Sequence, residues 1–152
     1  MKLLHRPSLF SWSAFDETKN VDFNGTLWVR EGGNIVIDPM PMSDHDRAHL
    51  VELGGVDWII MTNSDHTRWG QELAAETGAK LAAPSGERGA WPYDCDVWLS
   101  AGDTLVAGLQ ILEMHGSKTP GELALLIEGH TLVTGDLVRA HRAGSLMILP
   151  DA

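Results

Sequence analysis

The sequence is poor in cysteine, in positive charge and in long apolar runs, and each shortage excludes a class of protein. The 152 residues contain one cysteine, Cys95, so no disulfide can form within the chain. Lysine and arginine number 11 against 21 acidic residues, and the formal net charge of −10 argues against nucleic acid, whose binders need a basic face. No run approaches the roughly 18 apolar residues that a membrane-spanning helix needs. We therefore expect a cytoplasmic protein with no nucleic-acid partner and no membrane partner.

Cys95 is not expected to be a nucleophile. It lies in WPYDCDVW, between Asp94 and Asp96. Neighbouring carboxylates disfavour the thiolate and so raise the pKa of the thiol. The start of the chain, MKLLHRPSLFSW, is also not expected to be a secretory signal, because its apolar stretch is short and broken by His5 and Pro7.

The length and the patterning predict a single α/β domain over residues 1–152. Hydrophobic residues make up 43% of the chain, which is ordinary for a globular protein. The hydrophobic periodicity switches repeatedly between strand-like and helix-like. It predicts strands at 9–15, 25–31, 34–39, 56–62 and 80–84, with a turn at VDFNG between the first two. It also predicts helices at 43–54 and 67–78, short strands within 97–116, and a hairpin at 122–136 that turns at Glu128-Gly129. Helices inserted between strands, followed by an antiparallel set, indicate a mixed α/β sandwich.

The stretch IIMTNSDHTRWG, residues 59–70, carries the strongest suggestion of a functional site. An apolar strand runs into Thr62, a polar turn follows, and then a helical pattern begins. Later in the chain, HGSKTPGE (115–122) and LVTGD (132–136) place two further polar turns beside apolar strands.

These landmarks, in this order, resemble the metallo-β-lactamase superfamily over about residues 24–140. The resemblance implies a metallo-β-lactamase-like αββα sandwich with a dinuclear metal site, usually zinc, in which metal-bound hydroxide hydrolyses an ester, thioester, amide or phosphodiester. A metal of that kind lowers the pKa of its bound water to about 7 and needs neutral imidazoles and carboxylates as ligands.

The sequence departs from the family pattern at most of the implied ligand positions. Counting from Thr62, the resemblance puts Asn63, Asp65, Thr67 and Arg68 where the family carries its first ligand motif, and it puts Lys118 and Asp136 at later ligand positions. Only Asp136 is kept, and a final histidine would lie beyond residue 152. Arginine has no acceptor and a protonated lysine repels a cation. We therefore expect ammonium and guanidinium groups to replace the metal charge, with Lys118 paired to Asp136 and Arg68 paired to Asp65.

A second register of the turn keeps a metal site open as an alternative. If the turn has lost two residues, Asp65 and His66 match the end of the motif, and with Asp136, and His115 or His141, they could hold one metal. Zinc or another divalent metal is then a candidate cofactor, while a chain without a cofactor is the favoured prediction.

The remaining candidates are assigned to substrate contact or to the surface. Arg68, Lys118, His115 and Trp69 are predicted to bind substrate, either by orienting it or by stabilising negative charge as it develops. His45 and His49 have the i, i+4 spacing of zinc ligands, but a solvated helix surface is the favoured interpretation.

The sequence supports two function classes. The first is a hydrolase of a small ester-like or anionic substrate, with Asp65, His66 and Asp136 as catalytic residues. The second is a metal-free binding or scaffold protein that kept the fold and lost the chemistry. A metal-free hydrolase with His66 as general base would need a nucleophile, and Ser64 and Ser117 are candidates.

The C-terminal end also raises two expectations. The chain ends sixteen residues after Asp136, so we expect family elements to be missing there, and SLMILP lacks a covering helix. Either a partner subunit, as in a homodimer, or a continuation of the natural chain would cover it.

Overall fold

The computed structural model describes residues 1–148, except the side chains of Ala140 and His141, and the chain divides into two compact units. The first unit comprises residues 1–61 and 66–82, and the second comprises residues 62–65 and 83–152. Within residues 1–148, no helix is long and apolar enough to cross a membrane.

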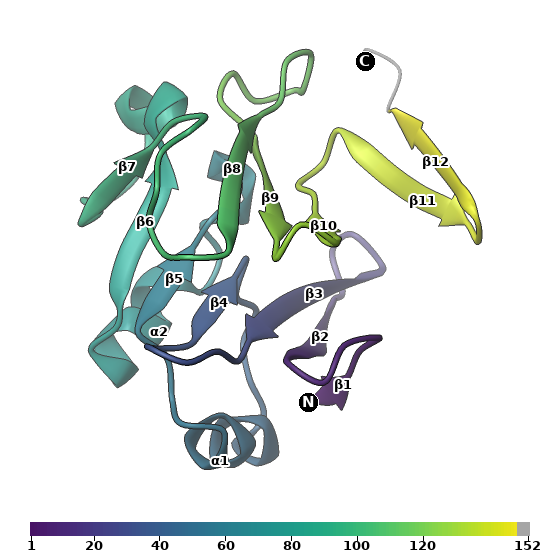
Figure 1. The fold of residues 1–152 in the computed structure, drawn as a ribbon. Helices are drawn as coiled ribbons and strands as arrows, with labels where there is room; N and C mark the ends of the chain where they lie inside the picture. Colours follow the sequence, from purple (N-terminus) through teal and green to yellow (C-terminus); the bar gives the residue numbers. More distant parts are fainter. Residues whose placement is uncertain (149–152) are drawn as a thin grey trace. The chain divides into compact units, whose positions relative to one another are not determined.

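The first unit contains a mixed sheet whose strands are neighbours in chain order (Figure 1). The strands are β1 (Lys2–Leu3), β2 (Leu9–Asp16), β3 (Val21–Trp28), β4 (Ile35–Ile37), β5 (Trp58–Ile60) and β6 (Lys80–Pro84). Pairing is antiparallel from β1 to β4 and parallel from β4 to β6. Parallel neighbours need a crossover connection, and helices α1 (Asp44–Glu52) and α2 (Gly70–Thr77) supply the two crossovers.

Both helices form where the sequence predicts them, with defined ends. The side chain of Ser43 caps α1 by accepting a hydrogen bond from the backbone N–H of Asp46. Gly78 ends α2 in the left-handed conformation, with φ of 75°. The start of α2 was predicted too early, at residue 67; residues 64–66 form a 3₁₀ turn and the helix begins at Gly70.

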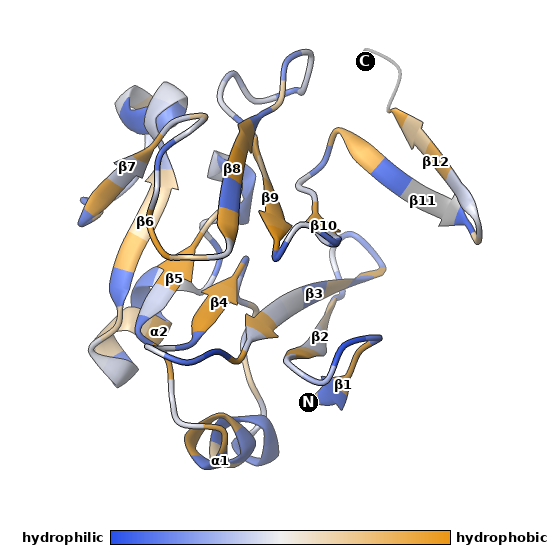
Figure 2. Cartoon of the chain, in the orientation of Figure 1, coloured by the Kyte–Doolittle hydropathy of each residue, from blue (hydrophilic) through white to orange (hydrophobic). Residues whose placement is uncertain are grey.

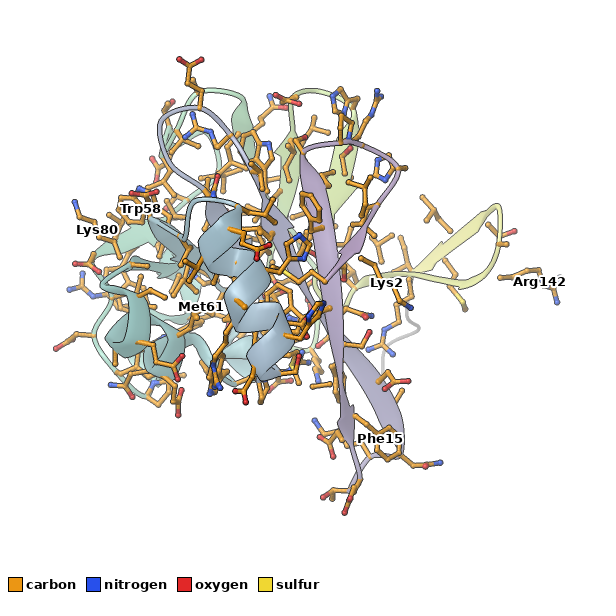
Figure 3. The ribbon with its side chains drawn as sticks, turned by 90° about the horizontal axis from the view of Figure 1, so that it is seen from below. Lys2, Phe15, Trp58, Met61, Lys80 and Arg142 are labelled. Atoms are coloured by element: carbon orange, nitrogen blue, oxygen red, sulfur yellow. The ribbon has the colours of Figure 1, made fainter. Side chains whose placement is uncertain are left out.

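The core of the first unit is centred on β4 and β5. All three residues of β4 are buried, as are Ile59 and Ile60 of β5. Figure 2 shows β4 hydrophobic along its length, as expected for a strand buried on both faces. At the margin of this core, Lys80 lies beside Trp58, with its ammonium 5.5 Å from the ring centroid (Figure 3).

The first hairpin differs from the prediction, which placed its turn at VDFNG. Those residues lie inside β3, which begins at Val21, and the turn falls just before them, where Asn20 has a φ of 52°. Asparagine tolerates this conformation, so it can end the turn. Phe15 lies toward the far end of this hairpin and is exposed (Figure 3).

The second unit contains a 3₁₀ helix, η2 (Ser85–Ala90), and short strands. They are β7 (Val97–Leu99), β8 (Leu109–Glu113), β9 (Leu123–Ile127), β10 (Thr131–Val133), β11 (Val138–Arg142) and β12 (Ser145–Ile148). Strand β9 lies between β10 and β8, and both pairings are antiparallel. The predicted turn between β9 and β10 is confirmed, since Glu128 and Gly129 both have positive φ.

Strands β11 and β12 form a separate hairpin that the sequence did not predict. Arg142 lies near its turn, where it is exposed (Figure 3). Leu146 and Ile148 of β12 are also exposed.

Candidate functional site

The polar turn after β5 is fixed by the side chain of Asn63. Thr62 and Asn63 are completely buried, and the Asn63 carbonyl oxygen accepts a hydrogen bond from the Asp65 backbone N–H at 3.0 Å. This side chain-to-backbone turn projects Asp65 outward, where its side chain is 46% exposed. The turn therefore presents one carboxylate to solvent from a buried base.

Glu122 is the buried hub of the second unit. Its side chain is wholly buried, and its two oxygens accept hydrogen bonds from three segments of the chain. The Ser117 hydroxyl donates at 2.6 Å, the Leu137 backbone N–H at 2.9 Å and the Asn63 amide at 3.5 Å. A buried carboxylate is costly unless it is hydrogen-bonded, and these donors meet that requirement.

A second buried carboxylate, Glu87, supports the same turns. Its oxygens accept from the backbone N–H groups of Ser64, at 2.7 Å, and of Gly121, at 3.2 Å. Next to it the backbones of Gly86 and Gly121 meet closely, because an ideal Cβ on Gly121 would lie 2.9 Å from Gly86 Cα. Glycine is therefore required at this crossing for steric reasons.

Lys118 joins two carboxylates that are far apart in the sequence. Its ammonium contacts Asp65 Oδ2 and lies 3.4 Å from Asp136 Oδ2. The hydrogen bond to Asp65 raises the pKa of Lys118 above its ordinary value; desolvation opposes this effect and the charge of Asp136 adds to it. Arg139 donates to Asp136 Oδ1 at 3.1 Å and to the Asp136 carbonyl oxygen at 3.0 Å. Lys118 therefore bridges the two carboxylates, and Arg139 pairs with Asp136 as well.

The predicted pairing of Lys118 with Asp136 is confirmed, and the contact between Lys118 and Asp65 was not foreseen. The prediction assigned Arg68 to Asp65. The structure shows the Arg68 guanidinium over the ring of Phe23, 4.1 Å from its centroid, and 3.3 Å from Met40 Sδ.

His66 lies in the first unit and forms a buried pair with Asp38. Its Nδ1 is 2.9 Å from Asp38 Oδ2, and the two residues are 7% and 6% exposed. Asp38 follows β4 and adopts a φ of 49°, which is uncommon for a residue with a side chain. The pair thus ties His66 to the residue that follows β4.

The remaining predicted residues have the following surroundings. Trp69 is half-buried, with the Arg47 guanidinium 5.0 Å from its ring centroid. His115 is exposed, and the side chain of His141 lies outside the described residues. The hydroxyl group of Ser117, a candidate nucleophile, donates a hydrogen bond to Glu122.

The sequence interpretation missed Glu122, Glu87 and Arg139. Glu87 stands in a polar glycine-rich stretch that offers no signal of burial. Glu122 directly precedes the apolar strand β9, which was the available hint. Glu122 contacts Asn63, which stands at the first implied ligand position. Lys118, from the same segment 115–122, contacts Asp65 at the next one.

The residues present do not fit the family's metal. Within residues 1–148, leaving aside the side chain at position 141, no three His, Cys, Asp or Glu side chains are arranged to hold a metal ion. Arg68 and Lys118 stand at implied ligand positions and cannot donate a lone pair while protonated. Lys118 also contacts the two carboxylates that would be needed as ligands.

Comparison with known proteins identifies the fold and the family. The chain is a mixed α/β protein in which polar turns follow buried strands and present carboxylates. The profile of the Metallo-beta-lactamase superfamily matches residues 1–152, so the chain belongs to the metallo-β-lactamase superfamily. This confirms the predicted fold class. A search of curated proteins gives no match.

Several solved structures are similar in fold. They include DIM-1 metallo-beta-lactamase (17% identity, TM-score 0.71, covering 94% of this chain and 71% of that chain). ETHE1 from Myxococcus xanthus has 22% identity and a TM-score of 0.66, covering 86% and 59%. The metallo-beta-lactamase from Pontibacter korlensis has 14% identity and a TM-score of 0.70, covering 94% and 73%. The chain thus spans between 59% and 73% of the length of these three proteins.

Proposed function

We propose that this chain is a metal-independent member of its superfamily that binds a small molecule, and that it is not a metallohydrolase. The observation that carries the proposal is the Lys118 ammonium, which contacts both Asp65 and Asp136. A metal ion and a protonated lysine compete for the same carboxylate oxygens. The lysine is part of the chain and needs no uptake from solution, so it has the advantage of a high effective concentration.

The metal-dependent alternative uses Asp65, His66 and Asp136 as catalytic residues and metal ligands. It requires Lys118 to leave both carboxylates. It also requires His66 to coordinate through the nitrogen that does not face Asp38. A histidine ligand commonly hydrogen-bonds a carboxylate in this way, so the pair with Asp38 is compatible with either function.

A metal-free hydrolase is the second candidate, and the pair of His66 and Asp38 favours it. A buried carboxylate beside Nδ1 fixes the orientation of the imidazole and stabilises its protonated form, which are the requirements of a general base. Arg68, Lys118, His115 and Trp69 remain the proposed substrate contacts. Cytoplasmic localisation and a homodimer also remain proposals.

The metal content of the purified protein separates these functions. The protein is prepared without chelator and without a metal-binding tag, beside Asp136→Ala. We expect far less than one metal per chain in both preparations. Near one zinc, iron or manganese per chain, lost in Asp136→Ala, would overturn the proposal and establish a metal site.

A ligand screen and an activity screen follow on the same protein. In a thermal-shift screen of small anionic and neutral molecules, we expect at least one compound to raise Tm in the wild type. Hydrolysis of ester or thioester probes that resists chelator and disappears in His66→Ala would favour the metal-free hydrolase instead.

A further inference from the structure

We propose that the Lys118 ammonium excludes divalent metal ions from the carboxylates of Asp65 and Asp136. Replacing Lys118 by an uncharged residue would then allow a divalent metal ion to bind these carboxylates. This inference rests on the proposed metal-independent function. Lys118 gives the two carboxylates, which would otherwise repel each other, a shared cation from within the chain.

Two anions converge on one nitrogen atom. Asp65 comes from the turn after β5 and Asp136 from the turn after β10, and both approach Lys118 Nζ. Two carboxylates placed this close repel each other unless a cation lies between them. A cation of some kind is therefore needed, and the ammonium supplies it.

The backbone turns that carry the two carboxylates are held by hydrogen bonds that do not involve Lys118. The Asp65 backbone N–H donates to Asn63, and the Asn63 amide donates to Glu122. On the other side, the Leu137 backbone N–H, directly after Asp136, also donates to Glu122. Buried Glu122 thus anchors both turns from below, so the carboxylates should keep their places when the exposed lysine is replaced.

The charge beside the two carboxylates depends on Lys118. Lys118 contributes one positive charge beside the carboxylates of Asp65 and Asp136. Arg139 partly neutralises Asp136 and would weaken any metal bound there. Removing Lys118 takes one positive charge away from the two carboxylates and leaves Arg139 beside Asp136. Oxygen ligands of this kind suit Mn²⁺ and Mg²⁺.

The test compares Mn²⁺ binding by the wild type and Lys118→Met, followed by electron paramagnetic resonance of free Mn²⁺ and by calorimetry. Methionine removes the charge and keeps a side chain of similar length. We expect Lys118→Met to gain one saturable site with a Kd at least about tenfold below any binding by the wild type. Lys80→Met is the matched control, since Lys80 lies over Trp58, and it should behave as the wild type does.

Two further variants make the assignment specific. Lys118→Arg keeps a cation and should still exclude Mn²⁺. Lys118→Met combined with Asp136→Asn should lose the gained site. Lys118→Gln replaces Lys118→Met if circular dichroism shows that the methionine variant does not fold.

The outcomes distinguish this inference from the proposed function. If the wild type is purified without metal and Lys118→Met binds Mn²⁺ no better, the inference is wrong while the proposed function stands. If the wild type already carries one metal per chain, the proposed function fails and the inference fails with it. A gained site that survives Asp136→Asn would place the metal elsewhere and would also overturn the inference.

Discussion

The Nδ1 atom of His66 lies 2.9 Å from Oδ2 of Asp38, and both side chains are buried. The two residues are brought together because Asp38 directly follows β4 and His66 ends the turn that follows β5, the parallel neighbour of β4. Adjacent parallel strands end at the same edge of a sheet, so the residues that follow them become neighbours. The pair links two crossover segments of the first unit.

Replacing Asp38 should destabilise the fold through the loss of this pair. We expect Asp38→Ala to lower the free energy of unfolding by about 1–3 kcal/mol, because it removes the carboxylate that faces the buried imidazole of His66. Asp38→Asn should cost less, since asparagine keeps an acceptor and tolerates the positive φ. Urea unfolding measures both, with exposed Asp44→Asn as control. Equal stability of Asp38→Ala and the control would contradict this role.

Glu122 should be intolerant of its amide analogue. In Glu122→Gln one acceptor oxygen is replaced by an NH₂ group that faces a donor, either the Leu137 N–H or the pair formed by Ser117 and Asn63. We expect a loss of about 1–3 kcal/mol in the free energy of unfolding. Glu52→Gln, on the exposed face of α1, is the matched control and should change it by less than about 0.5 kcal/mol. A loss as small as the control's would exclude Glu122 as the hub.

The glycine crossing in the second unit predicts a sharp steric effect. A methyl group on Gly121 would meet Gly86 backbone atoms at 2.9 Å, so we expect Gly121→Ala to cost about 1–3 kcal/mol. Gly89→Ala, in the same 3₁₀ segment as Gly86, meets no atom within 4 Å and serves as control. Thermal unfolding of the two variants checks the difference. Similar Tm values would show that the crossing can relax.

Cys95 should react slowly with thiol reagents at neutral pH. Partial burial, followed by the charges of Asp96 and Asp94, raises the pKa of the Cys95 thiol to about 11 from a model-peptide value of 9.0. The thiolate fraction near pH 8 is then about 100-fold lower than in the unfolded chain, and the reagent attacks only the thiolate.

The pH profile of alkylation by iodoacetamide tests this expectation. In the folded protein the rate should keep rising until about pH 11, whereas the urea-unfolded protein should level off near pH 9. Because the pKa is raised on folding, Cys95 contributes to the free energy of unfolding below pH 9, and this contribution is lost as the pH rises toward 11. A folded profile with its midpoint near 9 would contradict the assigned environment.

The sequence by itself determined the local elements and the family. Ser43 and Gly78 mark helix ends because capping is local chemistry, and Glu128-Gly129 marks a turn because few residues accept positive φ. It also gave Lys118 and Asp136 as an ion pair, on the basis of their places in the family pattern. It placed the first hairpin turn wrongly, because VDFNG resembles a turn, whereas the chain turns at Asn20 and β3 begins at Val21.

Only the tertiary structure decided what surrounds the charged residues. Asp65 shares Lys118 with Asp136, and Arg68 stacks on Phe23, because distances across space depend on how distant turns meet. The burial of Glu122 and Glu87 was likewise not readable from the sequence, since glutamate is ordinarily exposed. A charged residue becomes a buried hub when several segments offer it donors at once, and that convergence is a property of the folded chain rather than of any local pattern.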